Sequence, residues 1–181
     1  TPRQGGWKGW GMLRQINVGL ANYHKATIPQ ETINKYAAEA KFFRAWFFSD
    51  KVQLFGDVPW VGKPLNIDSE ELFGSRMPRE QAMDSILADI NFAIEHLPES
   101  WPDAASPSTS GRFNKWHALI LKSRIALFEG TWRKYHGGTN PNFWLEEAAS
   151  AAKEIIDNGP YAIYSTGDPD NDYREMFANE T

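Results

Sequence analysis

The sequence predicts an all-α protein made of antiparallel helical hairpins that are joined by long loops. Five segments repeat apolar residues at spacings of three and four, which is the pattern of a helix with one buried face. No segment sustains the two-residue alternation that indicates a half-buried strand. Small residues occur on the apolar helix faces, at Ala37, Ala40, Ala126, Ala149 and Ala152, where they would let two helix axes approach closely.

The first two helices are predicted over residues 7–23 and 29–55. Apolar side chains of the first recur from Trp10 through Leu13 to Tyr23. In the second, Pro29 suits the first helical position, and Gly56 suits the positive-φ position that follows a helix end.

Three further helices are predicted over residues 78–97, 114–130 and 143–158. Pro98 stops the third, while Asn114 is a suitable N-cap for the fourth and Gly130 is taken as its end. The predicted inner face of the fourth consists of Trp116, Leu119, Ile120, Ser123, Ala126 and Leu127.

Pairing the second helix with the third, and the fourth with the fifth, gives two hairpins of the tetratricopeptide type. The ideal period of that repeat is about 34 residues. The connections over residues 57–77 and 98–113 are too long for a regular array, and loops of such length are commonly functional. We therefore expect a tetratricopeptide-like scaffold with long decorated loops, and residues 1–181 are expected to be part of a single helical domain.

Composition narrows the classes of function. The net charge of −4 argues against a nucleic-acid-binding protein, which usually carries a basic face. With no cysteine there is no thiolate metal site, and the four histidines lack ligand spacing, so neither a metal nor a cofactor is expected. Eight tryptophans suggest aromatic packing or the recognition of flat apolar faces.

The most informative segment is the predicted second helix with the turn after it. It reads Ala38-Glu39-Ala40-Lys41-Phe42-Phe43-Arg44-Ala45, continues through Trp46 and Asp50, and ends in Phe55-Gly56-Asp57-Val58-Pro59. This pattern resembles the signature helix of the SusD/RagB family of outer-membrane nutrient-binding lipoproteins. Four later segments resemble that family in the same order: 77–93, 97–98 with 111–118, 121–130 and 148–164.

The resemblance implies a surface-exposed, lipid-anchored protein of the outer membrane. Such a protein captures an oligosaccharide or similar nutrient and delivers it to a SusC-like, TonB-dependent outer-membrane transporter. Members are longer than this chain, so we expect an internal piece of the amino-terminal half, with the lipid anchor outside it. The resemblance also implies that these helices are mainly scaffold and that no bond is broken, so no enzyme activity is expected.

The candidate ligand-binding residues are Trp60, Trp101 and Trp132, which lie in or beside predicted loops. An exposed indole can stack on the apolar face of a sugar ring. The alternative, which we favour, is that such tryptophans close the ends of the helical hairpins. Ligand contacts therefore remain unassigned, and we expect no catalytic residue.

The polar residues of the signature segment, Glu39, Arg44, Asp50 and Asp57, are expected to form a structural network of ion pairs and hydrogen bonds. Arg44 would neutralise a carboxylate, and Asp57 would hydrogen-bond within its own turn. The five aromatics from Phe42 to Phe48 suggest that this helix is buried on most sides.

Two other functions are consistent with the residues. A tetratricopeptide-like module could bind a protein segment in its groove without binding any glycan. An α-helical carbohydrate-active enzyme would need paired carboxylates that face each other across a cleft, and the sequence identifies no such pair. We also expect the chain by itself to expose an apolar helix face and to self-associate.

Overall fold

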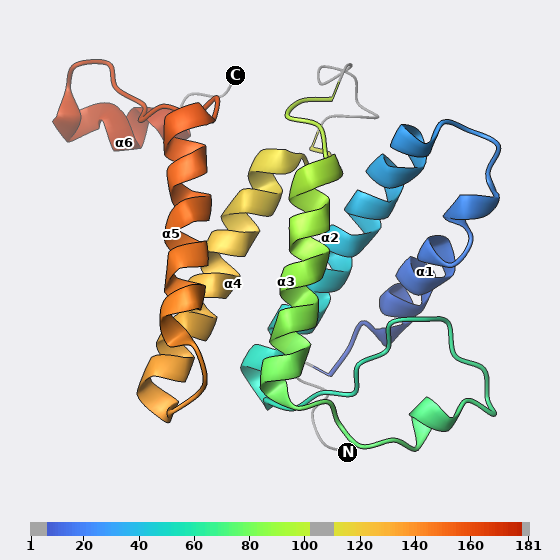
Figure 1. Ribbon diagram of the computed structural model, residues 1–181. Helices are drawn as coiled ribbons and strands as arrows, with labels where there is room; N and C mark the ends of the chain where they lie inside the picture. The colour runs from blue at the N-terminus through green and yellow to red at the C-terminus, as the bar shows by residue number, and fades with distance from the viewer. Residues whose placement is uncertain (1–6, 102–110, 179–181) are drawn as a thin grey trace.

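The computed structural model describes residues 7–101 and 111–178 (Figure 1). Its α-helices are α1 (Trp10–Leu20), α2 (Gln30–Phe55), α3 (Arg79–His96), α4 (Lys115–His136), α5 (Pro141–Asn158) and α6 (Pro169–Ala178). Two 3₁₀ turns, η1 (Tyr23–Lys25) and η2 (Glu70–Leu72), lie in the connections. The described residues contain no strand beyond an isolated antiparallel bridge between Val58 and Met77, so the predicted all-α class is confirmed.

The helices form two antiparallel hairpins, α2 with α3 and α4 with α5 (Figure 1). Packing of α3 against α4 joins the hairpins, and α1 covers α2 from the other side. In Figure 1 helices α3 and α5 lie in front, while α2 and α4 lie behind them, which is the two-layer order of tetratricopeptide repeats. No described helix is both long and apolar enough to cross a lipid bilayer.

Helix α2 ends where the sequence predicts. Gly56 follows it with φ 71°, a backbone conformation that glycine adopts without steric cost. Pro29 is the residue before the helix rather than its first residue, and its extended backbone leads into Gln30. The side of α2 that meets α1 and α3 buries Phe48 and Val52 completely or nearly so.

Helix α4 continues for six residues beyond Gly130, so the predicted end was wrong. Gly130 is buried, and a Cβ atom there would lie 2.8 Å from the Leu145 side chain of α5. The missing side chain therefore permits close packing of α4 on α5 instead of ending the helix. The end is at Gly137, whose left-handed backbone has φ 72° and ψ 26°.

The start of α4 agrees with the prediction. The side-chain oxygen of Asn114 accepts a hydrogen bond from the backbone N–H of His117 at 3.2 Å. In return His117 Nδ1 accepts the backbone N–H of Asn114 at 3.3 Å, which completes a capping box. Both backbone N–H groups lie at the start of the helix, where no helix carbonyl is available to accept them, so the cap fixes where α4 begins.

Two further helices depart from expectation. The first is shorter than residues 7–23, because the chain turns after Leu20 and forms η1. Helix α6 was not predicted, and none of its residues is buried. Its start was nevertheless signalled by Pro169 and by acidic residues in the first turn.

The loop over residues 57–77 is held against α1 and α2. The Val58–Met77 bridge closes its base, and the Trp60 ring stacks on Phe48 with centroids 4.1 Å apart. Asn17 of α1 is 1% exposed and donates to the carbonyl of Val61 at 2.8 Å. The predicted 98–113 loop lies partly outside the described residues.

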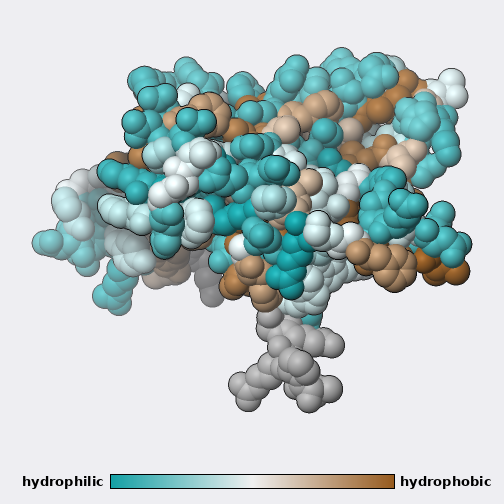
Figure 2. Space-filling model, turned by 60° about the horizontal axis from the view of Figure 1, so that its bottom comes forward, coloured by the Kyte–Doolittle hydropathy of each residue, from teal (hydrophilic) through white to brown (hydrophobic). Residues whose placement is uncertain are grey.

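Apolar side chains on the face shown in Figure 2 are distributed in separate brown patches among hydrophilic ones. Large exposed apolar residues occur on α4, on α5 and on α6; they include Ile120, Leu127, Ile156, Tyr173 and Phe177. Ile120 and Leu127 had been predicted to lie on the inner face of their helix, but they are 42% and 53% exposed. That α4 stripe is therefore not buried by α3 or α5.

Candidate functional site

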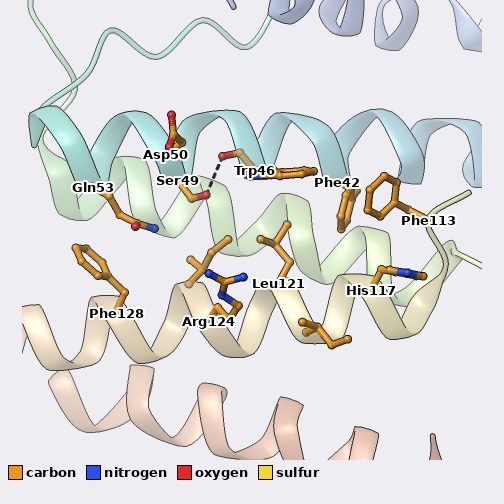
Figure 3. A pocket seen from close by; sticks show the side chains of 12 residues that line it. Phe42, Trp46, Ser49, Asp50, Gln53, Phe113, His117, Leu121, Arg124 and Phe128 are labelled. Atoms are coloured by element: carbon orange, nitrogen blue, oxygen red, sulfur yellow. Dashed lines mark hydrogen bonds between the residues drawn. The ribbon is translucent and has the colours of Figure 1, made fainter. Parts of the chain in front are cut away.

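A groove of about 510 Å³ lies between α2 and α4 (Figure 3). Its walls come from one side of each helix and from the residue that precedes the α4 cap. The lining residues are Phe42, Trp46, Ser49, Asp50, Gln53, Phe113, His117, Ile120, Leu121, Arg124, Ile125 and Phe128. We refer to this feature as the α2–α4 groove.

One end of the groove is aromatic. Phe113 packs against Phe42 with ring centroids 4.6 Å apart, and both contact the Trp46 region of α2. Trp46 is 48% exposed, so the prediction that α2 is buried on most sides was wrong at this position. The indole lies nearly parallel to the Phe43 ring, at an interplanar angle of 14° and a centroid separation of 6.5 Å.

Two of the polar residues in the groove are already engaged within the protein. The Ser49 hydroxyl donates to the carbonyl of Trp46 at 2.8 Å, as Figure 3 shows. His117 is part of the α4 capping box. These two side chains are therefore structural rather than free recognition groups.

The remaining polar groups are Gln53, Arg124 and Asp50, and Asp50 pairs with its neighbour Lys51 at 3.3 Å. In Figure 3 Gln53 and Arg124 point into the space between the helices, whereas Asp50 points away from α4. Within the described part of the chain, Arg124 has no carboxylate within 4.0 Å. By contrast, Arg44, Arg79, Arg112 and Arg133 each pair with at least one carboxylate.

The three predicted ligand tryptophans lie in different clusters, and none lines the α2–α4 groove. Trp60 stacks on Phe48. Trp101 donates its indole N–H to the Phe113 carbonyl at 3.0 Å, and the Arg112 guanidinium lies 3.6 Å from its ring centroid.

Trp132 lies at the other end of α4. The Arg79 guanidinium is 3.7 Å from its ring centroid, and the His136 ring stacks on it at 4.8 Å. All three tryptophans are half-buried, and each has a ring or guanidinium neighbour from the protein itself. Their role in ligand binding stays a prediction.

Polar residues of the signature helix α2 form ion pairs and hydrogen bonds within the protein, as the sequence predicted. Arg44 makes a bidentate pair with Asp89 of α3, at 2.6 and 2.8 Å, and also donates to the carbonyl of Gly62 at 3.1 Å. Glu39 pairs with Arg112, and the hydrogen bonds to that carboxylate raise the pKa of the guanidinium.

Asp57 acts at a different place from the one predicted. Its carboxylate accepts the backbone N–H of Arg79 at 2.8 Å, so it caps the start of α3 rather than its own turn. The contact joins two residues that are 22 positions apart. It therefore also fixes the base of the 57–77 loop.

Sequence reasoning missed a buried ionic cluster where α3 meets α4. Glu129 is fully buried between two arginines, with Arg79 at 2.6 Å and Arg133 at 2.7 Å. Burial lowers the pKa of Arg79, while the Glu129 carboxylate opposes that shift. The four-residue spacing of Glu129 and Arg133 was the available signal, but the same spacing is common on solvated helix faces.

At the rim of this cluster, Glu80 accepts hydrogen bonds from the backbone and hydroxyl groups of Thr139. These bonds lower the pKa of the Glu80 carboxyl group. Glu80 and Arg133 also lie 3.6 Å apart, so the start of α3 and the α4–α5 turn are held together. Residues 7–101 and 111–178 contain no group of three side chains suited to hold a metal ion.

The fold and groove define a class of protein: a helical-repeat scaffold with an open groove between its two hairpins. A family model described as "Starch-binding associating with outer membrane" matches residues 8–127. The chain belongs to this SusD-like family.

Relatives agree with that assignment. SusD-like protein P25 of Formosa agariphila is 27% identical over 173 residues, which cover 92% of this chain and 29% of that protein. A SusD superfamily protein of Bacteroides thetaiotaomicron has a similar structure, with a TM-score of 0.68 and 21% identity over 92% of this chain. A laminarin-binding SusD-like protein gives a TM-score of 0.65 with 24% identity over 82% of this chain.

The shared region is a minor part of these relatives. This chain covers 33% of the Bacteroides thetaiotaomicron protein and 28% of the laminarin-binding one. At such identities the structural likeness establishes the fold, namely the tetratricopeptide-like hairpins.

Proposed function

We propose that this chain is part of a longer outer-membrane protein that captures an oligosaccharide and delivers it to a transporter. The observation that carries the proposal is membership of the SusD-like family. Support for a glycan ligand comes from two structural neighbours, one described as laminarin-binding and one solved with a xylogluco-oligosaccharide. Capture would be non-covalent, through aromatic stacking and hydrogen bonds to hydroxyl groups.

Within that protein, residues 1–181 act mainly as the scaffold. The polar side chains of the hairpins are largely engaged in helix caps and ion pairs, such as Arg44 with Asp89 and Arg79 with Glu129. The three candidate tryptophans have protein neighbours that restrict access to their rings. These features favour placing most ligand contacts in the remainder of the longer protein.

The proposed partner is a TonB-dependent, SusC-like transporter, and the proposed location is the outer face of the outer membrane with a lipid anchor. Both rest on the family resemblance. Release to a transporter requires that the captured ligand dissociates, so we expect modest affinity and a fast dissociation rate.

The test is a binding screen of the full-length protein against soluble β-glucan and xyloglucan oligosaccharides, followed by titration calorimetry of any hit. We expect saturable binding without release of shorter sugars. Binding of no oligosaccharide class would contradict the proposal, and cleavage of the sugar would favour the α-helical enzyme instead. Co-purification of the transporter with the tagged full-length protein tests the partner separately.

A second candidate function is a tetratricopeptide-like module that binds a protein segment and no glycan. The open α2–α4 groove favours it, because the groove lies between the first helices of two consecutive hairpins. The same calorimetric screen distinguishes the two candidates. A protein ligand bound in the absence of any glycan affinity would support the module.

A further inference from the structure

We propose that the tip of the 57–77 loop is a preformed docking element for a separate protein, one whose binding pocket is apolar and edged by Lys or Arg side chains. The loop tip is defined as residues 64–75, which include η2. The inference stands apart from the proposed glycan capture, because it rests on the geometry and chemistry of the loop alone.

The loop tip projects from the helical scaffold. In Figure 1 the green loop carries η2 away from both layers of helices. Within the described residues, η2 packs against none of the α-helices. The tip is therefore a protrusion that lies outside the helical core.

Large apolar side chains gather on this protrusion. Ile67 and Phe73 are 85% and 84% exposed, and Leu72 is 53% exposed. Ile67 and Leu72 also line one hollow, of about 630 Å³, which Arg14 of α1 borders on the other side. Because these side chains bury little surface within the fold, packing does not account for their apolar character, whereas exposed apolar clusters are typical of interaction surfaces.

Hydrogen bonds from α1 and α2 hold the base of the loop tip. Asn17, which is buried, donates to two loop carbonyls at 2.8 and 3.4 Å, and Arg44 donates to the carbonyl between them at 3.1 Å. Arg14 donates to a fourth carbonyl at 2.5 Å. The acceptors are the backbone carbonyl groups of Val61, Gly62, Lys63 and Leu65. We refer to these contacts as the carbonyl clamp.

The tip itself is ordered by short-range hydrogen bonds. The Ser69 hydroxyl oxygen accepts the backbone N–H of Asn66 at 2.8 Å, and the Ser69 N–H donates to the Asn66 carbonyl at 3.1 Å. The N–H groups of Leu72 and Phe73 donate to the carbonyl groups of Ser69 and Glu70, at 3.0 Å each. An element that is ordered beforehand loses little conformational entropy on binding, so this order favours a docking element over a flexible linker.

The charge of the tip selects the kind of partner. Residues 64–75 contain three acidic residues and no basic one. Glu71 pairs with Lys63, whereas Asp68 and Glu70 pair with no basic side chain of the described residues. Two unpaired carboxylates beside an apolar cluster complement a pocket with Lys or Arg at its rim. An anionic lipid surface, or the same tip of a second copy, would repel them.

The test places a photoreactive side chain at the tip of the full-length protein in its own cells. Phe73 is replaced by p-benzoylphenylalanine, which keeps an aromatic ring at that position. Tyr135, an aromatic residue of α4 that is 76% exposed, receives the same group in the matched control. Mass spectrometry of the cross-linked peptides then identifies the residues on both sides of each new bond.

We expect one predominant cross-link from position 73 to a second protein, at least about tenfold more abundant than any intermolecular cross-link from position 135. The attachment site should be apolar, with Lys or Arg side chains around it. Attachment to a site without basic residues, to the remainder of the same polypeptide, to a second copy or to lipid would overturn the proposal. Equal yields at the two positions, or no cross-link, would overturn it as well.

The charge is tested by the double variant Asp68→Lys and Glu70→Lys, which carries the same photoreactive group at position 73. We expect the cross-link yield to fall at least about tenfold, because the new lysines would face the basic rim. Glu146→Lys, at an exposed position of α5, is the control and should leave the yield unchanged. An unchanged yield in the double variant would overturn the basic rim.

The apolar contact is tested by Ile67→Ser in the same background. We expect the yield to fall at least about threefold, because an apolar anchor is lost from the contact. Ile156→Ser, at a position of α5 that is 79% exposed, is the control and should have no effect. An undiminished yield in Ile67→Ser would overturn the assignment of an apolar pocket.

The carbonyl clamp is tested by Arg14→Met, which removes the hydrogen bond to Leu65 at an exposed position. We expect faster hydrogen–deuterium exchange of the Leu72 and Phe73 amides and a cross-link yield that is lower by at least about twofold. Gln15→Met, at the next and also exposed position of α1, is the control. Unchanged exchange and unchanged yield in Arg14→Met would overturn the preformed character of the element.

Discussion

The two sides of helix α2 differ in how deeply their side chains are buried and in how many of the charged groups on each side have partners. Toward α1 and α3, Phe48 is fully buried and stacked on Trp60, and Arg44 has partners on α3 and on the 57–77 loop. Toward α4, Trp46 is half exposed and Arg124 across the groove lacks a carboxylate within the described residues. The first side is part of the buried core, whereas the second lines an open groove and keeps exposed side chains.

The difference shows that the two sides of α2, the signature helix, have different roles. Its Arg44–Asp89 pair and its inward aromatics fix the hairpin and the loop that follows it. Its outward aromatic, Trp46, instead contacts Phe42, Phe43 and Phe113 beside the α2–α4 groove. Aromatic residues two positions apart on one helix can therefore differ completely in role.

The largest effect is expected from truncating the two aromatics separately. Phe48→Ala should lower the free energy of unfolding of the 181-residue chain by about 3–5 kcal/mol, since it removes a fully buried ring. Trp46→Ala should cost only about 1 kcal/mol. Urea unfolding followed by circular dichroism measures both, and equal losses would contradict the contrast between the two sides.

The charged residues should show the same contrast. Asp89→Asn leaves Arg44 without its carboxylate in a site where the Asp89 side chain is 5% exposed, so we expect a loss of about 3 kcal/mol. Arg124→Gln in the same chain should stay within about 0.5 kcal/mol. Thermal unfolding measures both variants, and a large loss from Arg124→Gln would mean that this residue already has a structural partner.

Much of the fold could be predicted from the sequence. The apolar spacing gave the five main helices, and Asn114 and Gly56 marked a start and an end that the structure confirms. The family resemblance rested on contiguous motifs, which are visible in one dimension. Arg44 was expected to neutralise a carboxylate, although its partner Asp89 is 45 positions away and was not named.

The groove could not be predicted, because it depends on which side of α4 faces α5. Ile120 and Leu127 fit an inner stripe by spacing alone, yet α5 packs on the side that contains Gly130. A glycine within a helical pattern can mark either the end of the helix or a position where a second helix packs closely. Only the position of Leu145 decides between the two.

Substitution of Gly130 should have an intermediate effect on the free energy of unfolding. Gly130→Ala should destabilise the chain by about 1–3 kcal/mol, because the new Cβ would lie 2.8 Å from the Leu145 side chain and 3.0 Å from its backbone nitrogen. Gly11→Ala is the control, since a Cβ there meets nothing within 4 Å. It should stabilise α1 by up to about 1 kcal/mol through helix propensity.

Denaturant unfolding distinguishes these two outcomes. If Gly130→Ala were stabilising, the close packing of α4 on α5 would be contradicted.

The smallest effect concerns pH. The pKa of Glu80 is lowered from its ordinary value of 4.5 by hydrogen bonds from Thr139, so its contribution is present above pH 4.5 and is lost as the pH falls through the lowered folded-state pKa. Because 33% of the Glu80 side chain is exposed to solvent, which screens the interaction, we expect less than about 1 kcal/mol. Stability measured from pH 7 to 3 should depend less on pH in Glu80→Gln.

We propose that residues 1–181 are mainly scaffold and that the glycan is captured mainly elsewhere in the longer protein. Titration calorimetry of one oligosaccharide panel against the full-length protein and against the 181-residue chain tests it most directly. We predict saturable binding by the full-length protein and none by the shorter chain. Binding by the shorter chain alone, abolished by Ala at Trp60, Trp101 or Trp132, would contradict the claim and place the site within these helices.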